Sequence, residues 1–275
     1  MNTSPDMNTS QRFVSAQTDG APMVADTNRG NRAAWAAGVV TTAAMIATPL
    51  VPRGGGARRL LSSVVVVGLA ATTAANAARR WGVRRTGAAA LGVAVSTAVV
   101  ERVGTRTGVP FGRYEYSGDL RPQIAGVPAI VPLAWFAMAV PSREAARAAL
   151  GGRSSATGRV VVGAAALTAW DLFLDPQMVA EGYWRWIRGG VYRGIPLSNF
   201  AGWFVTGLAV MMILERALPP EPVAPDAALV QQYGFMAVME TVGFARYFRD
   251  PIVAAVGGAA MLPLAAVSVV RTLRR

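Results

Sequence analysis

The sequence predicts an all-α integral membrane protein, a polytopic helical bundle of about eight transmembrane helices, on three observations. Hydrophobic residues make up 53% of the chain and its mean hydropathy is +0.35. Charged residues make up only 15%, whereas about 25% is usual for a soluble domain. Apolar runs of about 20 residues, the length that crosses roughly 30 Å of hydrocarbon as a helix, recur along the chain. The alternating strands of a membrane barrel are not visible.

The elements follow in order from a polar beginning. Residues 1–31 show no apolar period and are rich in Asn, Thr, Ser and Asp, which predicts a disordered tail without a secretory signal. Residues 32–275 are expected to form a single transmembrane domain. Its apolar runs are 33–51, 60–78, 86–103, 124–141, 159–175, 198–217, 229–248 and 251–270.

Details within these runs refine the count and the helix ends. The first three runs consist largely of small residues, which allow helices to pack closely. Polar residues such as Gln231 and Glu240 interrupt the seventh run, so seven or eight spans are expected. The Pro-rich stretch 219–228 is predicted to be a loop. Asp175 precedes Pro176, which predicts that the fifth helix ends there.

The charge of the chain indicates orientation rather than a partner. The net charge is +12, from 27 arginines, no lysine and 15 acidic residues. The arginines lie in short clusters between apolar runs, as membrane anchors and orientation signals do, so no nucleic-acid partner is expected. Their distribution favours both termini in the cytoplasm. Because consecutive spans cross in opposite directions, the loops 104–123, 176–197 and 246–250 are expected on one side of the membrane.

The residue types that are missing exclude several chemistries. The chain has no Cys and no His, which excludes disulfides, thiol nucleophiles, imidazole catalysis and the usual zinc sites. It carries no phosphate-binding loop, dinucleotide-binding motif or nucleophile elbow. The sequence therefore predicts neither a metal nor a cofactor. Any chemistry must use carboxylates, hydroxyls, amides, arginines and aromatic rings.

Aromatic residues concentrate in one block of the chain. Residues 111–204 hold 14 of the 22 Trp, Tyr and Phe residues. An interfacial aromatic belt would decorate the ends of all helices, so the concentration favours a shared aromatic site. Two loops in the block end in Gly-(Val/Ile)-Pro, at 126–128 and 194–196, and each is followed seven residues after its proline by a tryptophan. Proline in the first turn begins a helix, so Trp135 and Trp203 are expected to face inward.

The same block holds two acids inside an apolar run. Asp171 and Asp175 are four residues apart and share one helix face. A charge at the bilayer centre costs about 2.5–3.5 kcal/mol on insertion scales, and such residues are usually functional. Two like charges one turn apart favour protonation of one of them, which suits a division into acid and base. Purely structural roles are also open: Asp171 could pair with an Arg of a neighbouring helix, and Asp175 could simply border the water. Glu240 in the seventh run could join the site or make a polar contact with a Gln or Arg.

The block also contains a string of unusual motifs. They are Phe111-Gly112-x-Tyr114-x-Tyr116, Gly126-Val127-Pro128 with Val131-Pro132-Leu133-Ala134-Trp135, Ala169-Trp170-Asp171-Leu172-Phe173-Leu174-Asp175-Pro176-Gln177-Met178, Gly182-Tyr183-Trp184-x-Trp186 and Gly194-Ile195-Pro196-Leu197-Ser198-Asn199-Phe200-x-Gly202-Trp203. Over about residues 100–218 the chain resembles the membrane-bound carotenoid biosynthesis family, the family of the bisanhydrobacterioruberin hydratase of haloarchaea and the gamma-carotene 1',2'-hydratase of bacteria. The resemblance implies a hydro-lyase of the carotenoid 1,2-hydratase type, which converts the terminal C=C of an acyclic carotenoid end group to a tertiary 1-hydroxy group.

The residues fit the chemistry that the resemblance implies. An alkene hydratase needs a proton donor, a base for water and stabilisation of a tertiary cation, which carboxyl groups and aromatic faces can supply. Our hypothesis is that Asp171 donates the proton and Asp175 orients and deprotonates water, with Glu115 as a substitute in either role. Asn199 is expected to hold the water. The expected substrate-binding residues are Tyr114, Tyr116, Trp135, Trp170, Tyr183, Trp184, Asn199 and Trp203.

Two other functions stay open on the sequence alone. A membrane prenyltransferase acting on carotenoid ends would use acidic clusters and Mg²⁺, but the chain has one D-x-x-x-D pattern without a second cluster of similar density. A non-catalytic carotenoid-binding protein would bind pigment without changing its mass. The expected partners are an acyclic carotenoid, membrane lipid and, by association, other carotenoid enzymes.

Overall fold

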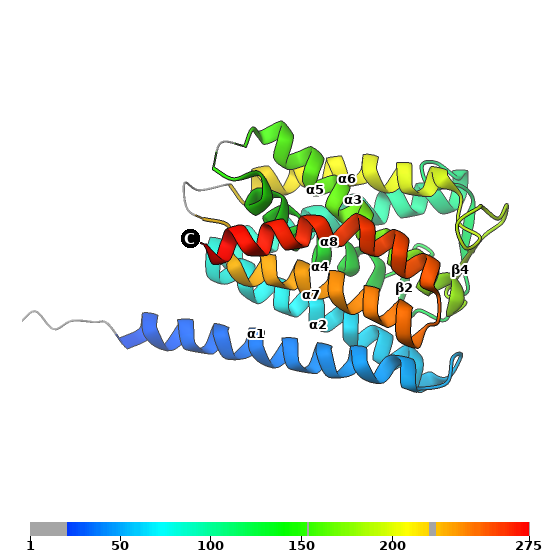
Figure 1. Cartoon of the computed structure of the whole chain (residues 1–275), viewed down its shortest axis with the longest axis horizontal. Helices are drawn as coiled ribbons and strands as arrows, with labels where there is room; N and C mark the ends of the chain where they lie inside the picture. The colour runs from blue at the N-terminus through cyan, green and yellow to red at the C-terminus, as the bar shows by residue number, and fades with distance from the viewer. Residues whose placement is uncertain (1–20, 153, 220–223, 275) are drawn as a thin grey trace, which may run out of the picture.

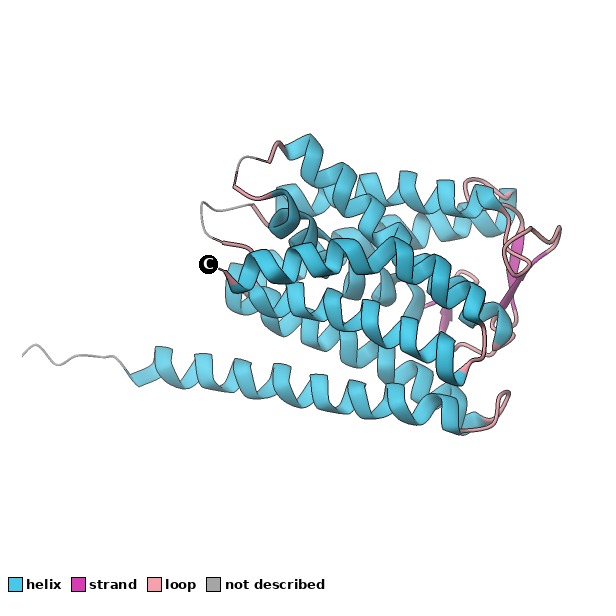
Figure 2. Ribbon diagram, in the orientation of Figure 1, coloured by secondary structure: helices cyan, strands magenta, loops and turns pink. Residues whose placement is uncertain are grey.

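The chain folds into a bundle of α-helices with two short two-stranded sheets at one end (Figures 1 and 2). The computed structural model describes residues 21–152, 154–219 and 224–274. This architecture confirms the predicted all-α bundle. The helices of the described residues are α1 (Ala21–Ala47), α2 (Gly56–Trp81), α3 (Val83–Thr107), α4 (Ile130–Leu150), α5 (Ala156–Ala180), α6 (Leu197–Ala217), α7 (Ala227–Val242) and α8 (Pro251–Leu273), with a 3₁₀ turn η1 (Thr48–Leu50) and a π-helical turn η2 (Gly243–Tyr247).

Helix α4 forms the centre of the bundle. It packs against all six helices from α2 to α8 other than itself, and most of its side chains are buried. Helix α1 lies at the outer edge and packs chiefly along α2 (Figure 1). The bundle therefore has a buried central helix and one peripheral helix that packs along α2.

Five helices of the described residues are long and apolar enough to cross a membrane: α2, α3, α5, α6 and α8. The apolar part of α1 is the shorter segment Ala34–Leu50. Helix α7 has 16 residues, about 24 Å of helix, which is less than the roughly 30 Å hydrocarbon layer. Helix α4 carries Arg143, Glu144 and Arg147 in its second half. These helices are consistent with a membrane protein, and the orientation of the termini stays a prediction.

The boundaries of the first and fifth helices differ from the predicted ones. Residues 1–20 of the expected tail lie outside the described residues, whereas residues 21–31 form the first turns of α1. Helix α5 does not end before Pro176 but continues to Ala180. A proline inside a helix leaves the carbonyl four residues earlier without its donor. Here the Tyr192 hydroxyl donates to the Leu172 carbonyl at 2.9 Å and replaces that donor.

The fourth helix is displaced toward the C-terminus relative to the run 124–141. Residues 123–128 form a hairpin of β2 (Gln123–Ile124) and β3 (Val127–Pro128) instead. Helix α4 then continues through Pro141, and the same compensation explains it. The carbonyl of Ala137, four residues before Pro141, accepts hydrogen bonds from Thr73 Oγ1 at 2.8 Å and from Gln232 Nε2 at 3.3 Å.

The extension of α4 buries charged residues that the sequence placed beyond the helix. Arg143 and Glu144 are fully buried and pair at 3.0 Å. Glu144 also pairs with Arg147 at 2.8 Å, and Glu215 of α6 joins Arg143 and Arg159 at 2.8 and 2.7 Å. Buried charges are tolerated when they are paired in this way. This network connects α4, α5 and α6 at the end of the bundle away from the sheets.

The loops at the opposite end pair with each other. Strand β1 (Tyr114–Tyr116) runs antiparallel to β4 (Trp184–Trp186), with Glu115 opposite Arg185. Arg193 and Asp250 form an ion pair at 2.6 Å that joins the second loop to the segment before α8. These contacts confirm that the loops 104–123, 176–197 and 246–250 lie on one common side.

Candidate functional site

A cavity of about 70 Å³ lies next to the β1–β4 sheet, and its wall is largely apolar. Four helices contribute polar groups to it: Ser62 from α2, Glu101 from α3, Asp175 from α5 and Asn199 from α6. The aromatic residues of the wall are Phe111, Tyr114, Tyr116, Trp135, Tyr183, Trp184, Trp186 and Trp203. A buried cavity with few convergent polar groups is the usual form of a small-molecule site.

Asn199 joins the two predicted aspartates. Its amide Nδ2 donates to Asp171 Oδ2 at 2.9 Å and also to Asp175 Oδ2. Asn199 lies in the first turn of α6, directly after the Gly-Ile-Pro sequence, and is buried. The Trp184 Nε1–H donates to the other oxygen of Asp175 at 3.1 Å. The structure therefore brings together the pair of carboxyl groups and the amide that the sequence assigned to one site.

The two aspartates differ in their access to the cavity. Asp175 lines it, whereas Asp171 has an exposed fraction of 0% and does not. Asp171 Oδ1 accepts no hydrogen bond from the described residues. Neither aspartate pairs with an arginine in the described part of the chain. Asp175 is thus the member of the pair that a ligand in the cavity can touch.

A third carboxyl group, Glu101, faces the same cavity and was missed by the sequence analysis. Its Oε2 accepts from the hydroxyls of Tyr114 and Tyr116, the latter at 2.8 Å, and its Oε1 accepts from Trp135 Nε1 at 3.2 Å. Three donors from two other elements hold both oxygens of this carboxyl group in a fixed orientation. Glu101 stands near the end of the third apolar run, and a single acid in such a run is the signal that identifies it.

The structure does not bring Glu115 to the cavity. Glu115 is the middle residue of β1, and successive side chains of a strand point to opposite faces. Because Tyr114 and Tyr116 face Glu101, Glu115 faces outward. Its side chain is 54% exposed and pairs with Arg185 at 3.4 Å. Glu115 is therefore a surface ion-pair partner and not a neighbour of the aspartates.

The two tyrosines are held as hydrogen-bond donors. Burial, followed by the negative charge of Glu101, raises the pKa of Tyr114 and of Tyr116 well above the ordinary value for a phenol. Both hydroxyls therefore keep their protons at neutral pH. They lie on the β1 strand and reach from the loop side toward the carboxyl group of α3.

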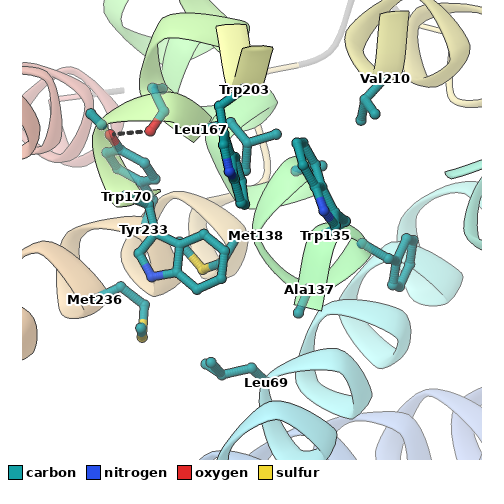
Figure 3. Packing of buried hydrophobic residues seen from close by; sticks show 14 of the residues in the cluster. Leu69, Trp135, Ala137, Met138, Leu167, Trp170, Trp203, Val210, Tyr233 and Met236 are labelled. Carbon is teal, nitrogen blue, oxygen red and sulfur yellow. Dashed lines mark hydrogen bonds between the residues drawn. The ribbon is translucent and has the colours of Figure 1, made fainter. Parts of the chain in front are cut away.

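Three tryptophans, Trp135, Trp170 and Trp203, lie close to one another in the core (Figure 3). The rings of Trp135 and Trp203 stack at a centroid distance of 3.8 Å, and Trp170 meets the Trp203 ring edge-on at 6.2 Å. Both Trp135 and Trp203 line the cavity, as expected for inward-facing residues. Of the eight predicted binding residues, Trp170 does not line this cavity and the other seven do.

The acidic groups are arranged as a pair and a single carboxylate. Within the described residues, no group of three or more Asp, Glu, His or Cys side chains is placed to hold a metal ion. The Asp171–Asp175 pair accepts hydrogen bonds from the amide of Asn199. Glu101 lies on a different helix, α3, and accepts hydrogen bonds from aromatic side chains. Such a set can transfer protons through carboxyl groups that differ in environment.

This fold and this cavity define an α-helical bundle, consistent with a membrane protein, that holds an aromatic-lined carboxylate site. The chain belongs to the carotenoid biosynthesis protein family, whose family model matches residues 56–266. That match confirms the resemblance noted in the sequence motifs and extends beyond residues 100–218.

The chain is also similar to a bisanhydrobacterioruberin hydratase from Haloarcula japonica. The two sequences are 34% identical over 134 residues. The aligned part is 48% of this chain and 45% of the relative, so the chain matches less than half of that protein's length. No solved structure matches the chain.

Proposed function

We propose that this protein hydrates the terminal C=C of an acyclic carotenoid end group and yields a tertiary 1-hydroxy group. One observation carries the proposal: carboxyl groups from two helices, Asp175 and Glu101, face one aromatic-lined cavity. Hydration of an alkene needs an acid and a base on the two sides of a reacting carbon pair. The Haloarcula relative is named as a hydratase, which supports the same reaction class.

The aspartate pair supplies the proton. Two carboxyl groups in a buried site repel each other when both are ionised, so the pair retains one proton. Asn199 donates to both, which holds the pair in a fixed geometry. Because only Asp175 lines the cavity, Asp175 delivers the proton to the alkene and Asp171 positions it. The sequence assigned the proton to Asp171 and the deprotonation of water to Asp175; here Asp175 takes the first role and Glu101 the second.

Addition of the proton to the less substituted carbon forms a C–H bond, converts the C=C double bond to a single bond and leaves a tertiary cation. Aromatic faces attract such a cation, by about 2 kcal/mol or more where water is excluded. Trp135 and Trp203 present such faces to the cavity, with Trp184 beside Asp175. The cavity therefore stabilises the charge that appears between the two proton transfers.

Water then bonds to the tertiary carbon, and Glu101 takes the proton that this water loses. The carboxylate of Glu101 is ready for this step, because Tyr116 and Trp135 orient its two oxygens. The alkene has gained one hydrogen and one hydroxyl, and the proton on Glu101 returns through water to the aspartate pair. The cycle is balanced without an oxidant or a reductant.

Expression in a host that accumulates lycopene tests the proposal. The expected product is heavier than lycopene by one water molecule, and Asp175→Asn and Glu101→Gln each lower its formation by about 100-fold or more. Glu115→Gln is the matched control, since Glu115 faces solvent. Hydration at the wild-type rate in both site variants would disprove the assignment.

The same product analysis separates the two alternatives. A prenyltransferase adds an isoprenyl unit and requires a prenyl diphosphate with Mg²⁺, so its product gains the mass of that unit. A non-catalytic carotenoid-binding protein leaves the mass of lycopene unchanged. Only a hydratase gives a product heavier by one water molecule without a prenyl diphosphate and Mg²⁺.

A further inference from the structure

A second cavity adjoins the candidate site. It has a volume of about 130 Å³ and lies between the end of α1, η1, α2, α5, α7 and η2. Four residues line both cavities and form the wall between them: Ser62, Val66, Leu174 and Met178. A ligand that leaves the first cavity past this wall therefore enters the second.

The wall of the second cavity is adaptable and largely apolar. Met178 of the shared wall is accompanied by Met45, Met236 and Met239. Methionine is unbranched and flexible, and its side chain fits ligands of different shape. This lining suits an isoprenoid better than a polar metabolite.

Two buried polar groups in this apolar wall, the carboxyl group of Glu240 and the indole N–H of Trp170, have no partner within the described residues. The Glu240 side chain makes no hydrogen bond or ion pair there, and Glu240 is only 8% exposed. The indole Nε1–H of Trp170 is buried and donates to no acceptor. In Figure 3 this nitrogen lies on the side of the ring toward Met236, another residue of the cavity. A buried polar group without a partner destabilises the folded state, so a ligand that supplies the partner is favoured.

The two groups are complementary to an alcohol. A hydroxyl oxygen accepts from the Trp170 N–H, and the hydroxyl hydrogen is donated to the Glu240 carboxyl group. A hydrocarbon chain satisfies neither of them. We propose that the second cavity binds the hydroxyl-bearing end of a linear isoprenoid, namely the tertiary alcohol formed in the first cavity. The identity of this ligand rests on the proposed function.

A third hollow provides room for the rest of a long ligand. An open groove of about 920 Å³ runs between α1, α2 and α7 and shares Ile46 and Leu69 with the second cavity. Helix α1, which forms one side of the groove, lies at the outer edge of the bundle (Figure 1). The three hollows form a series from the carboxyl groups to the outside. A linear chain fits this series, whereas a small alcohol would occupy the second cavity alone.

A binding experiment without turnover tests the proposal. All variants carry Asp175→Asn, so that bound lycopene is not converted, and the full chain is held in lipid nanodiscs. Lycopene and 1-hydroxylycopene, which differ by one water across the terminal C=C, are titrated by the quenching of tryptophan fluorescence. The variants are Glu240→Leu, which removes the hydrogen-bond acceptor, and Glu240→Gln, which keeps one. Met239→Leu is the matched apolar change in the same cavity.

The proposal expects a selective effect. Glu240→Leu weakens binding of 1-hydroxylycopene about three- to tenfold, as the loss of one hydrogen bond predicts, and leaves lycopene binding unchanged or tighter. Glu240→Gln and Met239→Leu retain most of the affinity for both ligands. Equal weakening for both ligands, or no change for either, overturns the proposal; the second result indicates that water alone occupies the cavity. If the wild-type protein does not hydrate lycopene, the proposed function is wrong, but the comparison of lycopene and 1-hydroxylycopene binding can still be made.

Discussion

The indole rings of Trp135 and Trp203 stack face to face, with centroids 3.8 Å apart and an angle of 12° between their planes. Each tryptophan follows a Gly-(Val/Ile)-Pro sequence by seven residues, and the two belong to α4 and α6. Two loops with the same pattern thus begin two helices that place matching rings at one depth. Stacking holds both rings in a fixed orientation, which leaves their other faces for a ligand or a neighbouring ring.

Replacement of Trp203 by leucine is expected to lower both the hydration rate and the stability. An aromatic pair contributes about 0.5–1.5 kcal/mol beyond its buried area, and loss of one cation-stabilising face of about 2 kcal/mol corresponds to a rate roughly 30-fold lower. Trp203→Phe should keep a larger part of the hydration rate and of the stability than Trp203→Leu does. Turnover of lycopene and thermal unfolding measure the two effects separately.

The control for that change is Trp81→Leu at the other end of the bundle. Trp81 is also buried, and its Nε1–H donates to the Pro219 carbonyl at 3.3 Å. This variant should lose stability while the folded protein keeps its turnover number. An unchanged turnover number in Trp203→Leu would show that the stacked pair serves the fold alone.

The two aspartates are expected to differ in their effect on turnover. Asp175→Asn removes the carboxyl group that lines the cavity and should lower the rate by about 100-fold or more. Asp171→Asn leaves Asp175 in place, so it should cost less and change the pH–rate profile, because the pair no longer shares a proton. Rates measured across a range of pH values check this. A larger loss in Asp171→Asn, with an unaltered profile, would return the proton-donor role to Asp171.

The sequence was sufficient for the features that depend on periodicity and hydropathy. The helical bundle, the common side of the loops and the joint location of Asp171, Asp175 and Asn199 follow from such patterns and are seen in the structure. The choice between Glu115 and Glu101 does not follow from them. It depends on the pairing of β1 with β4, which is a contact between segments about 70 residues apart in the chain. A prediction of membrane spans from hydropathy assigns no strands to the loops between the helices.

The positions of helix ends were unpredictable for a related reason. Pro176 and Pro141 would each end a helix that had no other donors nearby. The missing donors come from Tyr192 in one case and from Thr73 and Gln232 in the other. These partners are distant in sequence, so the proline rule placed the end of α5 too early, and the apolar run 124–141 stopped short of the end of α4.

Loss of the Tyr192 hydroxyl is expected to destabilise α5 near its proline. Tyr192→Phe leaves the Leu172 carbonyl without a donor, which costs about 1–3 kcal/mol when the group is buried. Burial raises the pKa of Tyr192 to about 12, so the hydroxyl remains protonated at neutral pH. Thermal unfolding of the purified protein measures the loss.

A double-mutant cycle with Pro176→Ala identifies the cause. Alanine at this position restores the backbone N–H that can donate to Leu172. Tyr192→Phe should therefore cost much less in the Pro176→Ala background than in the wild type. Equal costs in the two backgrounds would mean that Tyr192 acts through its packing against Phe200 and not through the carbonyl.

Asp250 is expected to make the stability of the loop end depend on pH. Partial burial alone would raise the pKa of Asp250, but the hydrogen bond from Arg193 and backbone donors at the start of α8 outweigh it and lower the pKa below the ordinary value. A lowered pKa in the folded state gives stability that is present above the unfolded pKa, about 3.9, and is lost as the pH falls through the folded one. Asp250→Asn keeps the cap of α8 and removes the charge, whereas Asp250→Ala removes both and should cost about 1 kcal/mol more. Thermal unfolding at neutral and acidic pH should show that the advantage of the wild type over Asp250→Asn disappears at low pH; an advantage that persists there would mean that the ion pair with Arg193 contributes nothing.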